Sequence, residues 1–134
     1  MATFFTPQTD PALFACDCGA CPPEFSVTPA LALLECLDRL RARVGHPLRV
    51  TSGVRCPAAN ARVGGVIGSE HTTGEGADLA TADSRGRYAL IHAALGLGLT
   101  RLGIGPTWVH VGIAARFPAP VLWWEAPHPP QQEP

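Results

Sequence analysis

The chain has 134 residues, and 46% of them are hydrophobic, which is enough for one domain with a buried core. Its formal net charge of −1 gives no basic surface for nucleic acid or for an anionic membrane. No apolar run approaches the roughly 20 residues of a membrane span, and the N-terminus lacks the features of a signal peptide. We therefore expect a monomer that is cytoplasmic as synthesised and binds neither nucleic acid nor membrane.

The N-terminal segment contains several prolines, which exclude a long helix there. We expect residues 1–27 to form an irregular Cys- and Pro-rich segment that packs on the domain. Residues 28–126 then form the domain itself. The Pro-rich residues 127–134 are expected to be a disordered tail.

The five cysteines are numerous for a chain of this length, and their odd number argues against a complete set of intrachain disulfides. Cys16, Cys18 and Cys21 lie close together, whereas Cys36 and Cys56 stand apart. Two interpretations stay open. The three clustered thiols could hold a second, structural metal ion with Cys56 or another residue as fourth ligand, or they could be reduced and pack like small apolar side chains.

Apolar spacing predicts two main helices and a shorter one. The first begins at Thr28-Pro29, where a hydroxyl precedes a helix-starting proline, and ends before Gly45. A short helix is expected near 58–63. The second main helix covers about 85–97, with Asp83 or Ser84 at its N-cap.

Alternating residues predict strands over 48–51, 76–80, 101–105 and 108–113, with a final edge strand at 121–124. Together these elements predict an α+β fold with a small, mostly antiparallel sheet.

The most informative motif runs from Ser69 to Asp78 and includes His71, and a second histidine, His110, lies in a predicted strand. Two imidazoles and one carboxylate are three ligands, which leave one position open on a tetrahedral Zn²⁺, as in catalytic zinc sites. A single histidine bonded to the backbone is the alternative interpretation.

Upstream of this motif the chain reads Val50-Thr51-Ser52-Gly53-Val54-Arg55-Cys56-Pro57, followed by a Gly-rich loop. With the histidine motifs, this stretch resembles the M15 family of zinc D-Ala-D-Ala carboxypeptidases and murein endopeptidases, and most closely its short single-domain branch from bacteria and phages. The resemblance extends from about residue 14 to residue 124. It implies a metal site at the face of the sheet with His71, Asp78 and His110 as zinc ligands.

The resemblance also implies roles for two further residues. Arg55 matches an arginine that lies beside the metal and interacts with the substrate carbonyl, where it would stabilise a developing oxyanion. Ser69 matches a serine that helps hold the substrate. A surface salt bridge for Arg55 and a simple turn for Ser69 are the alternatives.

The general base is harder to predict. Some M15 branches carry an acid three residues before the last histidine, where this chain has Thr107. Many short relatives carry an Asp two residues after that histidine, where this chain has Gly112. Glu70 and Glu75 are the carboxylates nearest to the motif in sequence, and either could serve as the base.

Two functions follow from these observations. The first is a zinc peptidase that hydrolyses peptidoglycan stem peptides next to a D-amino acid, as a carboxypeptidase or an endopeptidase. Such an enzyme would reach the cell wall by release or by export through other machinery. The second is a catalytically impaired zinc-holding module that binds wall peptide or a protein partner. The tryptophans could line a substrate groove or pack in the core.

Overall fold

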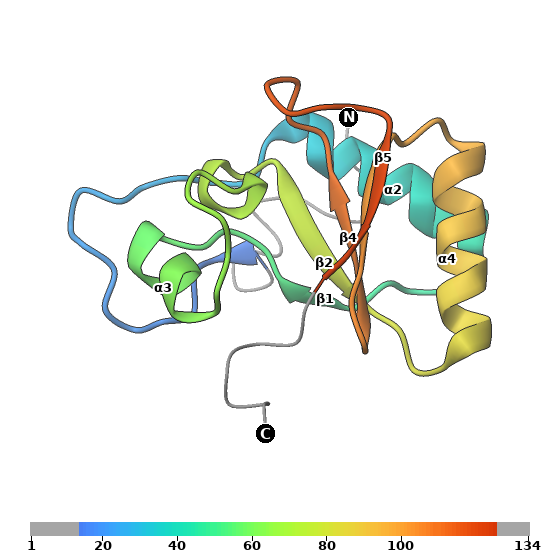
Figure 1. Ribbon diagram of the computed structural model, residues 1–134, viewed down its shortest axis with the longest axis horizontal. Helices are drawn as coiled ribbons and strands as arrows, with labels where there is room; N and C mark the ends of the chain where they lie inside the picture. Colours follow the sequence, from blue (N-terminus) through green and yellow to red (C-terminus); the bar gives the residue numbers. More distant parts are fainter. Residues whose placement is uncertain (1–13, 126–134) are drawn as a thin grey trace.

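A five-stranded sheet with the order β1-β2-β4-β3-β5 organises the fold (Figure 1). The computed structural model describes residues 14–125. Neighbouring strands are antiparallel except for β3 and β5, which are parallel. The strands are β1 (Val50–Ser52), β2 (Gly76–Ala80), β3 (Arg101–Ile104), β4 (Trp108–Gly112) and β5 (Val121–Trp124). The predicted α+β class is confirmed, and β5 lies at the sheet edge.

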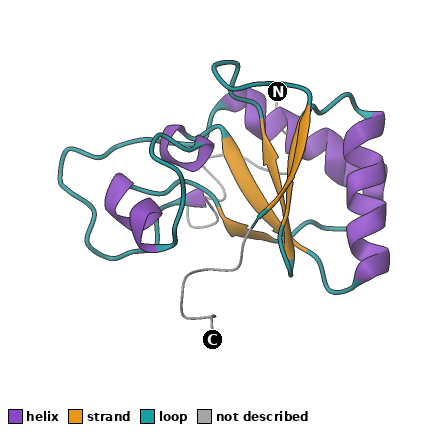
Figure 2. Ribbon diagram, in the orientation of Figure 1, coloured by secondary structure: helices purple, strands orange, loops and turns teal. Residues whose placement is uncertain are grey.

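Three α-helices and one 3₁₀ turn complete the described part of the chain: α2 (Leu31–Val44), α3 (Pro57–Arg62), α4 (Ser84–Gly96) and η1 (Glu70–Thr73). Helices α2 and α4 pack against each other, and α4 contacts β4. Figure 2 shows these two helices on one side of the sheet, whereas α3 and the loops around it lie on the other. No described helix has the length and apolar character needed to cross a membrane.

The main core lies between the sheet and the two long helices. Leu33, Leu37 and Leu40 of α2 recur at helical spacing and are fully buried. Val109 and Val111 of β4 face the same core and are also fully buried. Because side chains alternate along a strand, His110 must point to the opposite face, which is the face that carries polar groups.

The start of α2 differs from the prediction. The helix begins at Leu31, and Ala30 before it is extended, so Thr28 does not cap it. The cause is a contact distant in sequence, because the Ala30 N–H donates to the Gly74 carbonyl oxygen at 2.8 Å. This bond ties the segment before α2 to the loop of the histidine motif.

The other predicted boundaries agree with the structure within about two residues. Gly45 ends α2 with a left-handed backbone at φ 89°. The Asp83 carboxylate caps α4 by accepting from the Gly86 N–H at 2.8 Å. The predicted tail at 127–134 and the first 13 residues lie outside the described residues.

Candidate metal centre

A single row of residues crosses the polar face of the sheet. Strand register places Asp78 of β2 opposite His110 of β4, His110 opposite Gly103 of β3, and Gly103 beside Trp123 of β5. His71 reaches this row from η1, which directly precedes β2. Two central strands and one short turn therefore deliver the three predicted metal ligands to one point.

The ligand atoms of the His–Asp–His cluster are close together and buried. His71 Nε2 lies 3.2 Å from Asp78 Oδ1, and His110 Nδ1 lies 3.0 Å from the same oxygen. The two ring nitrogens are 3.1 Å apart. A tetrahedral ion with Zn–N bonds of ~2.0–2.1 Å separates its ligand atoms by about 3.3 Å. The three atoms thus have the spacing that such an ion requires.

The outer nitrogen of each imidazole is already bonded to an acceptor. His71 Nδ1 lies 2.6 Å from the Gly53 carbonyl oxygen, which can only accept, so Nδ1 carries the proton. His110 Nε2 lies 2.9 Å from Glu70 Oε1 and donates to that carboxylate. Both inner nitrogens are then lone-pair donors facing Asp78. The two inner nitrogens and the Asp78 carboxylate all present lone pairs to one buried space. A cation must balance them there, and a metal ion fits this set of ligands.

The close approach of these ionisable groups shifts their pKa values. Burial alone would lower the pKa of His110, but its hydrogen bonds to Asp78 and Glu70 raise that pKa to about 9. Burial would raise the pKa of Asp78, but the two imidazoles hold it well below its usual range. The neighbouring carboxylates thus favour a positive charge beside His110 Nδ1, the position at which a metal ion would bind.

Glu70 reaches the site in a role other than the predicted one. Its carboxylate is buried and accepts from His110 Nε2, on the side of the ring away from the metal ligands. It also accepts from Arg101 Nε at 2.8 Å, from Arg101 Nη2 at 3.4 Å and from the Ala114 N–H at 3.0 Å. Burial opposes ionisation, yet these bonds lower the pKa of Glu70 to about 2. Four donors occupy both oxygens, so this carboxylate orients His110 and has no free lone pair.

Gly112 explains how Glu70 fits. A Cβ atom at position 112 would overlap the Glu70 carboxylate. An acid from η1 thus occupies the space beside position 112, where the resemblance led us to expect an Asp. The sequence shows only the missing Asp, because this contact joins residues 42 positions apart.

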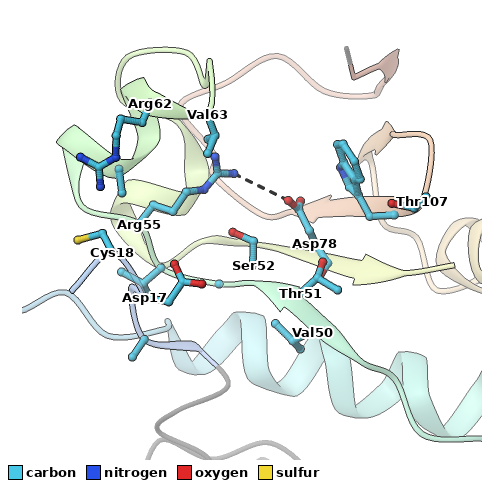
Figure 3. A pocket seen from close by; sticks show the side chains of 15 residues that line it. Asp17, Cys18, Val50, Thr51, Ser52, Arg55, Arg62, Val63, Asp78 and Thr107 are labelled. Carbon is cyan, nitrogen blue, oxygen red and sulfur yellow. Dashed lines mark hydrogen bonds and ion pairs between the residues drawn. The ribbon is translucent and has the colours of Figure 1, made fainter. Parts of the chain in front are cut away.

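Arg55 lies beside one of the three candidate metal ligands. Its guanidinium approaches the Asp78 carboxylate, with Nη2 3.8 Å from Oδ2 (Figure 3). Burial lowers the pKa of Arg55, while Asp78 opposes that change. Within the described residues the buried Nε atom of Arg55 has no hydrogen-bond partner.

Two cavities meet at this arginine. One of about 780 Å³ extends past Cys18 and Thr51, and another of about 610 Å³ contains the metal ligands. Arg55, Asp78 and Trp108 line both of them. Because they share these lining residues, the two cavities adjoin beside the candidate metal ligands.

Ser69 and Glu75 hold loops in place. Ser69 lines the smaller cavity, but its hydroxyl donates to Asn60 Oδ1 at 3.0 Å. Glu75 accepts from Thr73 Oγ1 at 2.6 Å and pairs with Arg116, and it lines neither cavity. The substrate-binding role of Ser69 stays a prediction, and the geometry gives no support to Glu75 as the base.

Glu125 is the carboxylate that the sequence reasoning missed. It follows β5, lines the cavity of the metal ligands, and accepts from Trp108 Nε1 at 2.7 Å and Trp123 Nε1 at 3.0 Å. Its Oε2 lies above Gly103, 2.7 Å from where a Cβ would be, and Gly103 is the cross-strand partner of His110. Strand alternation puts residues 123 and 125 on one face, which was the available signal.

Comparison with known proteins agrees with this geometry. The family model described as Peptidase M15 matches residues 8–112, which is most of the chain. This chain belongs to the peptidase M15 family. A search of curated proteins found no match. As a family member the chain is a metallopeptidase by descent, and its His–Asp–His cluster is the candidate metal site.

Family membership and donor set point to the same three side chains. The matched region contains all of the candidate ligands, His71, Asp78 and His110, but ends before Glu125. Glu125, which lines the same cavity, therefore follows a strand that lies beyond the matched region.

Proposed function

We propose that this M15 family member is a zinc peptidase that hydrolyses peptide bonds next to D-amino acids in peptidoglycan stem peptides. The observation that carries the proposal is the buried convergence of two imidazole lone pairs and one carboxylate beside a groove that contains a buried arginine. Zinc held by His71, Asp78 and His110 would polarise the scissile carbonyl and acidify water.

The chain's own residues account for the remaining chemistry. Arg55 lines both cavities, so its guanidinium can donate to the carbonyl oxygen of the substrate and stabilise its negative charge as the amide is attacked. Glu125 accepts the proton of the attacking water and returns it to the leaving amine. Within the described residues each Glu125 oxygen accepts one indole bond, so a lone pair remains free on each. Glu70 differs, because both of its oxygens are fully bonded.

The groove favours an endopeptidase over a carboxypeptidase. Cavities continue on both sides of Arg55 and Asp78, so a substrate can extend in both directions from the scissile bond. The alternative of an impaired binding module rested on the missing Asp at position 112. Glu70 fills that space and Glu125 supplies a free carboxylate, so nothing in the described site favours that alternative.

The test is mass spectrometry of cross-linked and uncross-linked muropeptides after incubation with the zinc-loaded chain. We expect cleavage within the cross-linked peptides and loss of cleavage in His71→Ala. Glu125→Gln should retain zinc and lower turnover about 10²–10⁴-fold.

Two matched variants complete this experiment. Glu24→Gln changes an exposed glutamate that lines neither cavity, and it should leave turnover unchanged. Glu75→Gln removes a carboxylate that the sequence offered as the base, whereas the proposal assigns that role to Glu125. The Glu75→Gln variant should therefore still cleave the peptides. Full turnover by Glu125→Gln would overturn its role, and absence of cleavage by the zinc-loaded wild type would overturn the proposed function. Release of terminal D-Ala alone would identify a carboxypeptidase.

A further inference from the structure

Four of the five cysteines form a second cluster, apart from the His–Asp–His centre. One sulfur from each of Cys16, Cys18, Cys21 and Cys56 lies within 4.8 Å of all the others. Cys18 Sγ is 3.4 Å from Cys21 Sγ and 3.7 Å from Cys56 Sγ. A tetrahedral zinc ion with Zn–S bonds of ~2.3 Å separates its sulfur ligands by about 3.8 Å. The cluster thus has the size of a four-thiolate metal site.

The backbone around the cluster supports sulfurs that carry negative charge. The Ala20 N–H donates to Cys18 Sγ at 3.3 Å, and the Cys56 N–H donates to Cys16 Sγ at 3.4 Å. Gly19, which lies between Cys18 and Cys21 in the sequence, has a left-handed backbone with φ 74°. This conformation turns the chain so that Cys21 lies beside Cys18. Such amide bonds orient thiolate ligands and offset part of their charge.

Disulfide bonds and simple packing explain the cluster less well. A disulfide joins two sulfurs at ~2.03–2.05 Å, whereas Cys18 lies at similar, longer distances from two partners. All five cysteines are free, and Cys36 is buried in α2 outside the cluster. Four sulfurs that converge within 4.8 Å of one another suit a bound cation better than an apolar contact.

We propose that Cys16, Cys18, Cys21 and Cys56 bind a second zinc ion whose role is structural. The ion replaces the thiol protons, which are released to solvent, and all four coordination positions are filled by sulfur. A closed site of this kind has no position for water and does no chemistry on substrate. It links the segment at 16–21 to the loop that precedes α3.

A zinc ion at the cysteine cluster would also affect the position of Arg55 in the groove. Cys56 directly follows Arg55, and the next residue, Pro57, begins α3. Cys18 and Arg55 line the same cavity, as Figure 3 shows. A zinc ion on Cys56 would therefore fix the backbone that presents the Arg55 guanidinium to Asp78.

The decisive experiment measures metal content without relying on activity. The full chain carrying His71→Ala and His110→Ala has lost the His–Asp–His site, so any bound zinc reports on the cysteines. After purification under reducing conditions without chelators, elemental analysis should find about one zinc per chain. Adding Cys18→Ser should remove it, and adding Cys36→Ser, the matched buried control, should not.

A second readout needs no cysteine substitution. Titration of the same double variant with a mercurial thiol reagent should release zinc in step with modification of four thiols. Exchange for Co²⁺ should give the charge-transfer absorption of a tetrahedral thiolate complex. A metal-free protein whose intact mass shows five reduced thiols would overturn the proposal, as would a mass that shows disulfides. Iron in place of zinc would overturn the choice of metal. None of these outcomes depends on whether the chain cleaves peptides.

Discussion

Glycine at position 112 leaves room for the Glu70 carboxylate, which fixes the His110 ring through Nε2. The same carboxylate accepts from Arg101 and from the Ala114 N–H. The orientation of one metal ligand therefore depends on a residue that lies 40 positions away in sequence. A carboxylate in this place keeps Nδ1 of His110 directed at the metal centre.

Gly112→Asp should therefore impair the protein, although it restores an acid that short relatives carry. The new side chain would overlap the Glu70 carboxylate and bring two negative charges together in a buried site. We expect a loss of about 1–3 kcal/mol in the free energy of unfolding, measured by urea denaturation. Zinc affinity should also fall.

Two further variants separate the steric effect of Gly112→Asp from the effect of its added charge. Gly112→Ala adds the steric conflict alone and should cost less than Gly112→Asp. The double variant Glu70→Ala with Gly112→Asp moves the acid from one position to the other and should recover much of the zinc affinity. A Gly112→Asp protein as stable as the wild type, with higher turnover, would contradict the account.

At the scale of elements, α2 provides the apolar surface on which the sheet rests. Leu37 is fully buried in this helix, whereas Leu31 at its start is 59% exposed. Leu37→Ala should lower the free energy of unfolding by about 2–5 kcal/mol, because it leaves a cavity between α2 and the sheet. Urea denaturation at a fixed zinc concentration measures this change. Leu31→Ala, in the same helix, should change stability by less than about 0.5 kcal/mol, and equal losses would contradict the packing described.

Elements defined by local pattern were predictable from the sequence. The apolar period of α2, the cap of α4 and the alternation in β4 depend on neighbouring residues, and all three agree with the structure. The start of α2 was misplaced because the bond from Ala30 to Gly74 is not visible in local sequence. Contacts between distant segments set such boundaries.

The candidate site was predictable in part for the same reason. The His71, Asp78 and His110 pattern follows from residue type and spacing, and strand register brings the three together. Glu125 was missed because the parallel pairing of β3 and β5 is non-local. The sequence left undecided whether Cys56 or another residue is the fourth ligand of the thiol cluster. Only the fold places the Cys56 sulfur beside the other three.

For the whole molecule, the two clusters predict that metal supports folding. Each cluster joins segments distant in sequence, so an ion bound to the native state but not to the unfolded chain raises stability. Removal of metal with a strong chelator should lower Tm, and addition of Zn²⁺ should restore it. Equal Tm with and without bound zinc, measured by calorimetry, would contradict a structural contribution from either ion.

The most direct test of the central claim is anomalous diffraction at the zinc edge from crystals of the zinc-loaded chain. We predict one peak bonded to His71 Nε2, His110 Nδ1 and an Asp78 carboxylate oxygen, with Glu125 facing it across the cavity. A second peak should lie among the four sulfurs. Absence of a peak at the His–Asp–His cluster, or a zinc ion bonded to His110 Nε2 with Glu70 displaced, would contradict the account.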